Sequence, residues 1–192
     1  MKTTKIIEGI FLTLAVFVIA VVLGPKCHLN SDFIAGSFMT HTIMLALSVG
    51  LIIALRKQVN FRIAMPQFKQ TLKPLLFGFL TAVVVNITLG IITVIVSGSA
   101  EKHPGVANAS LLQFLVFDMI MAPVAEESLF RGFLQNYLRP LSDKGFTLFH
   151  RRISLPVLIS ASAFSLAHLI LIASGVGILF LVRILVFTFV LG

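Results

Sequence analysis

The chain has 192 residues, of which 58% are hydrophobic and 11% are charged, and its formal net charge is +8. A soluble domain carries about 25% charged residues, so this chain cannot cover a globular surface with polar groups. The composition excludes a soluble enzyme, a disordered protein and a nucleic-acid-binding domain. The single cysteine, Cys27, excludes an internal disulfide and a multi-cysteine metal cluster.

Six apolar segments follow one another along the chain. Spanning about 30 Å of hydrocarbon takes about 20 helical residues, and none of these runs alternates as a transmembrane β-strand would. We therefore predict an all-α fold, a polytopic transmembrane helical bundle that forms a single membrane domain over residues 1–192. The segments are Ile6–Leu23, Phe33–Leu55, Leu75–Val96, about Leu111–Leu138, Ile153–Ala173 and Val176–Leu191.

Basic residues alternate between the connecting loops. The second loop holds five Lys or Arg residues and the fourth holds four, whereas the first and third hold one each. Cytoplasmic loops carry the excess of positive charge, so we expect a multi-pass protein of the cell membrane with a cytoplasmic N-terminus. The first segment is longer than the core of about 7–15 residues in a signal peptide, which favours a retained helix.

The fourth segment contains the sequence Glu-Glu-Ser-Leu-Phe-Arg at 126–131. Ionisable groups inside a membrane are functional candidates because they are costly to bury. Glu127 and Arg131 have the i,i+4 spacing of a helical ion pair, whereas Glu126 points about 100° away and remains available as a general base. A solvated acidic turn at a helix end is the alternative, but the apolar helical pattern continues to Leu138.

The fifth segment carries Phe164 and His168 on one helix face. A membrane histidine alone is more often a helix–helix hydrogen-bonding residue than a catalyst. A stripe of Ser and Ala residues at 160–165 precedes it and permits close packing against a neighbouring helix. We expect this packing to bring His168 toward Glu126.

These two motifs, Glu-Glu-x-x-x-Arg and Phe-x-x-x-His, resemble those of the CAAX-protease and bacteriocin-processing (CPBP, or Abi) family of intramembrane proteases. Their order, their separation of about 40 residues and their place on consecutive segments carry the resemblance. It covers about residues 110–192, so residues 111–192 correspond to a partial protease core and residues 1–110 to N-terminal helices.

The resemblance implies an intramembrane endopeptidase in which Glu126 and His168 activate a water, with Glu127, Arg131 and Phe164 in supporting roles. It implies a peptide or protein substrate, such as a prenylated tail, a bacteriocin leader or a membrane regulatory protein. No cofactor is expected. A divalent metal is not favoured, because adjacent helical residues such as Glu126 and Glu127 point apart.

The sequence departs from the family in one respect. A further His-x-x-x-Asn or His-x-x-x-Asp motif, which supplies oxyanion donors in relatives, is expected on a later helix, and no histidine follows His168. We interpret the chain as truncated at its C-terminus. Losing one oxyanion donor costs about 10²–10³ in rate, so we expect the 192-residue chain by itself to be inactive or nearly so.

Two other functions stay open. A non-catalytic scaffold or bacteriocin-immunity protein would function normally without Glu126 or His168. A small ion- or proton-coupled transporter would use a path through the acids of segment four and Arg183 of segment six. Asp118 either lines the cavity or pairs with Arg183, Pro123 favours a kink beside Glu126, and His41 and Asn86 are expected to form hydrogen bonds across helices.

Overall fold

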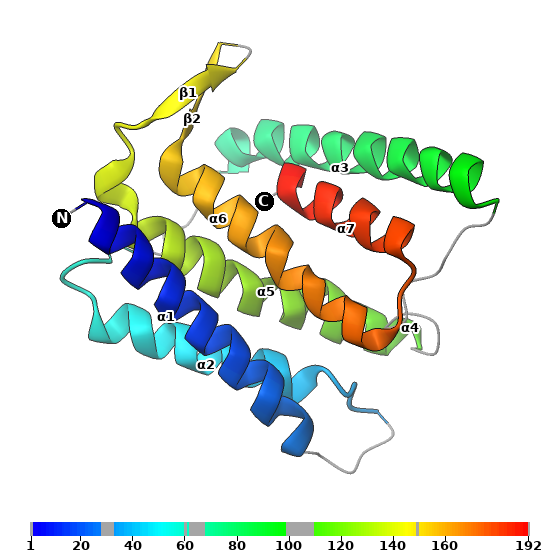
Figure 1. Cartoon of the computed structure of the whole chain (residues 1–192), viewed down its shortest axis with the longest axis horizontal. Coiled ribbons are helices and arrows are strands. Elements are labelled where there is room, and N and C mark those ends of the chain that lie inside the picture. The colour runs from blue at the N-terminus through cyan, green and yellow to red at the C-terminus, as the bar shows by residue number, and fades with distance from the viewer. Residues whose placement is uncertain are drawn as a thin grey trace. The chain divides into compact units, whose positions relative to one another are not determined.

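The computed structural model describes residues 2–27, 33–59, 61, 68–98, 110–148 and 150–191. Every predicted apolar segment contains a helix (Figure 1), which confirms the all-α expectation. The second helix begins at Phe38 rather than at the predicted Phe33, because residues 33–37 form turns. The long helices are α1 (Lys2–Leu23), α2 (Phe38–Ala54), α3 (Phe68–Ser97), α6 (Leu155–Ala167) and α7 (Ile178–Leu191). Short 3₁₀ turns follow three of the helical segments: η1 (Gly24–Lys26), η4 (Arg139–Leu141) and η5 (His168–Ser174).

The fourth segment is one continuous run of helical turns that changes its hydrogen-bond register. It passes through α4 (Leu111–Gln113), η2 (Phe114–Met121), α5 (Ala122–Glu127) and η3 (Ser128–Gln135), of which η2 and η3 are π-helices. Ser110 begins this run with a capping box. The Ser110 hydroxyl accepts a hydrogen bond from the backbone N–H of Gln113, and the Gln113 side-chain oxygen accepts one from the backbone N–H of Ser110.

A β-hairpin precedes α6 and was not predicted. Strands β1 (Gly145–Leu148) and β2 (Arg151–Ser154) pair antiparallel, with Phe146 opposite Ile153. The predicted start of the fifth segment at Ile153 is therefore wrong, and the helix begins at Leu155. The apolar side chain of Ile153 extended the predicted run, but its backbone pairs with a strand.

The chain divides into two compact units. The first comprises residues 1–61 and 105–163, and the second comprises residues 62–104 and 164–192. In the first unit, α2 packs against α1, α5 and η3 around a core that contains Phe117, Leu129, Phe133 and Leu134. In the second unit, α3 packs against α7.

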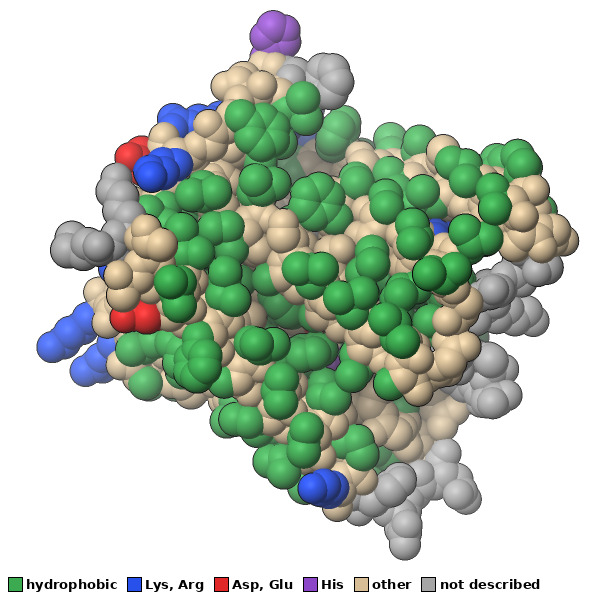
Figure 2. All heavy atoms as spheres, in the orientation of Figure 1, with side chains coloured by type: hydrophobic (Ala, Val, Ile, Leu, Met, Phe, Trp, Pro, Cys, Tyr) green, Lys and Arg blue, Asp and Glu red, His purple; other side chains and the backbone are tan. Residues whose placement is uncertain are grey.

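Three helical stretches of the described residues are long and apolar enough to cross a membrane, and they are Thr3–Lys26, Thr71–Ser97 and Leu155–Ser174. The helices α2 and α7 are apolar but shorter. Figure 2 shows hydrophobic side chains over most of the visible face, with basic side chains at its margins. Such a surface suits a lipid environment, because apolar groups gain nothing from contact with water. The chain is a membrane protein.

Candidate active site

The acidic motif lies at the junction between an α-helix and a π-helix. Glu126 and Glu127 end α5, and Arg131 lies in η3. Arg131 Nη1 is 3.2 Å from Glu127 Oε1, so the predicted i,i+4 ion pair is confirmed. The Glu127 side chain is 57% exposed and that of Arg131 is 21% exposed. The pair therefore lies at the edge of the first unit rather than in its core.

Glu126 differs from its neighbour in both burial and partners. It is half-buried, and no hydrogen bond or ion pair joins its carboxylate to another residue in the described part of the chain. Arg131 forms its ion pair with Glu127. Adjacent helical residues point about 100° apart, so the Glu126 side chain points away from that pair. The arrangement leaves Glu126 as the carboxylate that can accept a proton.

The histidine motif has a defined local geometry. His168 is the first residue of η5, and its Nδ1 lies 2.9 Å from the carbonyl oxygen of Phe164. Because a carbonyl oxygen only accepts, Nδ1 carries the proton and Nε2 carries the lone pair of a neutral imidazole. The Phe164 ring packs edge-on against the imidazole, with ring centroids 5.0 Å apart. Phe164 thus fixes both the tautomer and the ring orientation of His168.

The two motifs fall in different units. Glu126, Glu127 and Arg131 belong to the first, and Phe164 and His168 belong to the second. Each motif is well formed by itself. The meeting of Glu126 with His168 stays a prediction.

Close packing between segments four and five is confirmed at Ser160. This residue of α6 is fully buried, and its hydroxyl donates to the carbonyl oxygen of Phe130 in η3 at 2.8 Å. The predicted small-residue stripe therefore joins the acidic helix directly. The same stripe continues in the second unit, where the Ser165 hydroxyl donates to the Leu185 carbonyl oxygen at 2.7 Å.

The N-terminal helix α1 contacts the C-terminal end of the fourth helical segment, which carries the Glu-Glu-x-x-x-Arg motif. Tyr137 donates its hydroxyl proton to Glu8 Oε2 at 2.8 Å, and the Lys5 ammonium lies 5.8 Å from the centre of the Tyr137 ring. Gly9 makes the close approach possible, because a Cβ there would lie 3.1 Å from the Tyr137 ring. The sequence analysis did not predict this contact. Glu8 and Tyr137, an acid and a hydroxyl donor on two different apolar segments, could have indicated it.

Of the remaining polar candidates, Asp118 and His41 lie in the first unit, and the buried Nδ1 of His41 has no hydrogen-bond partner among the described residues. Asn86 accepts a hydrogen bond from Arg183 Nη2 at 2.6 Å, as predicted for a bond between helices. His150 is exposed at the hairpin turn, and the predicted loop residues His28 and His103 lie outside the described residues.

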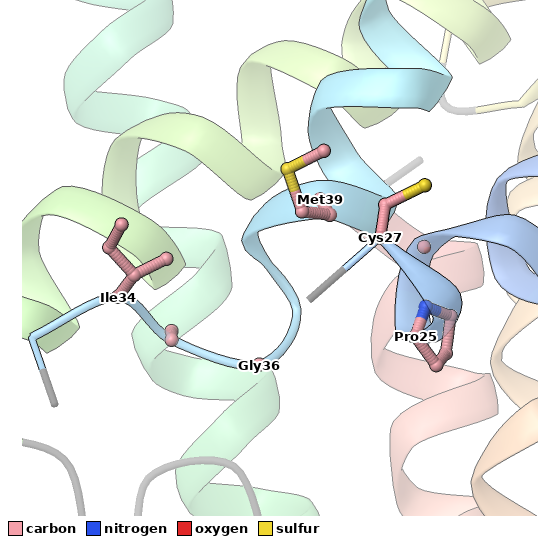
Figure 3. Close-up of a pocket in the computed structure, with 7 residues that line it drawn as sticks. Pro25, Cys27, Ile34, Gly36 and Met39 are labelled. Carbon is pink, nitrogen blue, oxygen red and sulfur yellow. The ribbon is translucent and has the colours of Figure 1, made fainter. Parts of the chain in front are cut away.

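The first unit contains a hollow that is distinct from the acidic motif. This cavity of about 230 Å³ lies between η1 and the start of α2 (Figure 3), and Pro25, Cys27, Ile34 and Met39 are among its lining residues. None of the predicted catalytic side chains reaches it. Within the described ranges, no three His, Cys, Asp or Glu side chains are grouped so that they could hold a metal ion.

Comparison with known families supports the motif assignment. Residues 108–192 match a family model described as type II CAAX prenyl endopeptidase Rce1-like. No curated protein and no solved structure matches the chain. The matched region contains both the acidic motif and the Phe-x-x-x-His motif. The resemblance of this region to the CPBP membrane proteases is therefore confirmed, with the match covering residues 108–192.

Proposed function

We propose that the protein is an intramembrane endopeptidase in which Glu126 is the general base and His168 orients the attacking water. The observation that carries this proposal is that the two glutamates of the matched region, residues 108–192, differ in their partners. Glu127 is paired with Arg131 at 3.2 Å, while Glu126 is half-buried and joined to no described residue. A general base has to be free to take a proton.

In the proposed reaction, Glu126 takes a proton from a water molecule as the water oxygen bonds to the scissile carbonyl carbon. The C=O electron pair moves onto the oxygen and gives a tetrahedral oxyanion. Collapse of the oxyanion breaks the C–N bond, and the proton held by Glu126 passes to the leaving amine. His168 Nε2 accepts a hydrogen bond from the water, since Nδ1 is committed to the Phe164 carbonyl.

Arg131, Glu127 and Phe164 support this chemistry without touching the reacting atoms. Arg131 holds Glu127, and its positive charge lies on the helical turns that also carry Glu126. Phe164 orients the imidazole. We propose a mechanism independent of metal. A zinc site needs at least three protein ligands. Glu126 and Glu127 are adjacent helical residues that point apart, and Glu127 is paired with Arg131, so the two glutamates do not favour binding one ion together with His168.

The description of the matched family points to the substrate class. We propose a peptide or membrane-associated protein with a prenylated CAAX tail, and a bacteriocin leader or membrane regulatory protein is the alternative. The apolar surroundings of the acidic motif favour a substrate that enters from the bilayer. The predicted topology, with the N-terminus and the second and fourth loops in the cytoplasm, would open the site toward the cytoplasm.

The test uses the complete open reading frame that contains these 192 residues, reconstituted in lipid vesicles with a fluorogenic farnesylated CAAX peptide. General bases contribute about 10²–10⁴ to a rate, so Glu126→Gln and His168→Ala should each lower kcat by at least about 100-fold. His150→Ala is the matched control, because His150 is exposed on the hairpin and should leave the rate unchanged.

Three results would contradict the proposal. Cleavage by Glu126→Gln at the wild-type rate would remove Glu126 from the chemistry. Normal biological function of both Glu126→Gln and His168→Ala in cells would favour the scaffold or immunity protein. Activity that disappears on chelation and returns with a divalent cation would overturn the metal-independent mechanism.

A further inference from the structure

The β1–β2 hairpin has one apolar face and one polar face. Side chains alternate between the two faces of a strand, and residues directly opposite each other in an antiparallel pair share a face. The opposite pairs are Phe146 with Ile153 and Leu148 with Arg151 on one face, and Thr147 with Arg152 on the other. The first face therefore carries three apolar side chains and one arginine, whereas the second carries a threonine and an arginine.

The apolar face of the hairpin is open in the structure. Phe146 is 48% exposed and Leu148 is 45% exposed. Figure 1 shows the hairpin extending beyond the N-terminal end of α6, which belongs to the same unit up to residue 163. Phe149, between the two strands, lies outside the described residues. Because apolar surface gains free energy on leaving water, this face suits an apolar environment at the start of α6.

Backbone hydrogen bonds hold the hairpin at the end of a candidate membrane span. Strand β2 ends at Ser154, and Leu155 is the first residue of the candidate span Leu155–Ser174. The Leu155 N–H donates to the Lys144 carbonyl oxygen at 2.8 Å, and the Lys144 N–H donates to the carbonyl oxygen of buried Leu141 at 3.0 Å. A strand of four residues is about 13 Å long, so the whole hairpin stays close to the membrane surface.

Basic side chains lie at both ends of the apolar face. Lys144 directly precedes β1, Arg151 is the first residue of β2, and both are exposed. Residues 139–154 contain four Lys or Arg residues but one acid, Asp143. The Asp143 carbonyl oxygen accepts a hydrogen bond from Arg152 Nη2, which braces the base of the hairpin. Long basic side chains can lay their stems along apolar surface while their charged groups reach the headgroups.

A layer of anionic phospholipid complements both features of the hairpin. Its acyl chains accept apolar side chains, and its phosphates attract Lys and Arg near the membrane surface. An acidic surface of a soluble protein would match the cations, but it would leave the apolar face in contact with polar groups. The direct connection to α6 also places the hairpin beside lipid in a membrane protein.

We propose that the apolar face of the β1–β2 hairpin inserts into the membrane surface beside α6 while Lys144 and Arg151 bind anionic phospholipid headgroups. Amphipathic elements bury their apolar face about 5–10 Å into the boundary between headgroups and acyl chains. The anchored hairpin would hold the connection between the fourth helical segment and α6 at the membrane. This assignment does not depend on peptidase activity, since no residue of the hairpin belongs to the proposed catalytic motifs.

The test uses single tryptophans, because the 192 residues contain none. Phe146→Trp places the indole on the apolar face, and Thr147→Trp places it on the opposite face as a matched control at the neighbouring exposed position. Each variant is reconstituted in vesicles of phosphatidylglycerol and phosphatidylcholine, in which one lipid or the other is brominated close to the headgroup. We expect brominated lipid to quench the fluorescence of Phe146→Trp strongly and that of Thr147→Trp weakly.

The two brominated lipids report the local lipid composition around the hairpin. A basic residue near an anionic surface favours anionic lipid by about 5-fold, so phosphatidylglycerol should be enriched around Phe146→Trp by at least about 5-fold over its bulk fraction. Arg151→Gln and Lys144→Gln, each combined with Phe146→Trp, should lower this enrichment. Arg56→Gln, which changes an exposed cation of another loop, should retain it.

Four results would overturn the proposal. Equal quenching of Phe146→Trp and Thr147→Trp would show that the apolar face does not insert. Equal quenching by the two brominated lipids would remove the preference for anionic headgroups. Enrichment that survives in both Arg151→Gln and Lys144→Gln, once circular dichroism shows the variants to be helical, would remove the two cations from the contact. Protection of Phe146→Trp from brominated lipid and from aqueous iodide would show that protein, such as a second copy of the chain, covers this face.

Discussion

The hydrogen bond from Ser160 to the Phe130 carbonyl gives a direct measure of how strongly α6 holds the acidic helix. Ser160 is fully buried and donates at 2.8 Å, whereas Ser162 on the same helix is half-buried and forms no hydrogen bond with a described side chain or backbone group. Ser160→Ala deletes this bond without adding volume. Ser162→Ala is therefore a matched control on the same helix.

The expected cost follows from the value of such bonds in proteins. An intramolecular hydrogen bond contributes a net 0.5–1.5 kcal/mol, and polar contacts between membrane helices average about 0.6 kcal/mol with a maximum of about 1.7. We expect Ser160→Ala to lower the free energy of unfolding by about 1 kcal/mol. Ser160→Val should cost about 1–3 kcal/mol, because it adds methyl groups at a fully buried position.

The assay is reversible unfolding in mixed micelles, in which the fraction of dodecyl sulfate is increased and helicity is followed by circular dichroism. Ser162→Ala should remain within about 0.5 kcal/mol of the wild type, as substitutions away from special features usually do. If Ser160→Ala and Ser162→Ala unfolded at the same detergent fraction, the inferred coupling between α6 and η3 would be refuted.

Two further outcomes test packing and topology. Gly24→Ala should destabilise the protein by about 1–3 kcal/mol in the same assay, because the new Cβ would lie 2.6 Å from Thr40 Cα, whereas Gly36→Ala has no atom within 4 Å and should be neutral. Cys27 is exposed in the first loop, so an impermeant thiol reagent applied to intact cells should label it. Cys27→Ser combined with Lys57→Cys should be labelled only after permeabilisation, and the opposite pattern would refute a cytoplasmic N-terminus.

Hydropathy and spacing predicted the helical segments and the Glu127–Arg131 pair because both depend on side chains that can be read from the sequence. The start of α6 could not be predicted in this way. Ile153 continues the apolar run of the fifth segment, but its backbone pairs with Phe146 in the hairpin. Phe146 lies on the other side of the hairpin turn, so the local hydropathy around Ile153 gives no indication of this pairing.

The π-helices were also missed, because a change in backbone hydrogen-bond register leaves the apolar pattern of a helix largely intact. Pro123 was the available signal. Proline has no N–H to donate to the residue four positions earlier, and η2 ends at Met121, shortly before it. Local departures from the α-helical register occur frequently at functional sites. The acidic motif lies directly after this interruption.

The second change of register lies inside the acidic motif, yet it leaves the i,i+4 pair intact. The α-helix ends at Glu127, and the π-helix that contains Arg131 begins at Ser128. The turn between the two partners is therefore already π-helical, in which backbone bonds join residues five apart. Arg131 Nη1 nevertheless lies 3.2 Å from Glu127 Oε1, four residues earlier. The long Arg131 side chain thus keeps the partner that the sequence spacing predicts, and Glu126 remains the carboxylate without an ion pair among the described residues.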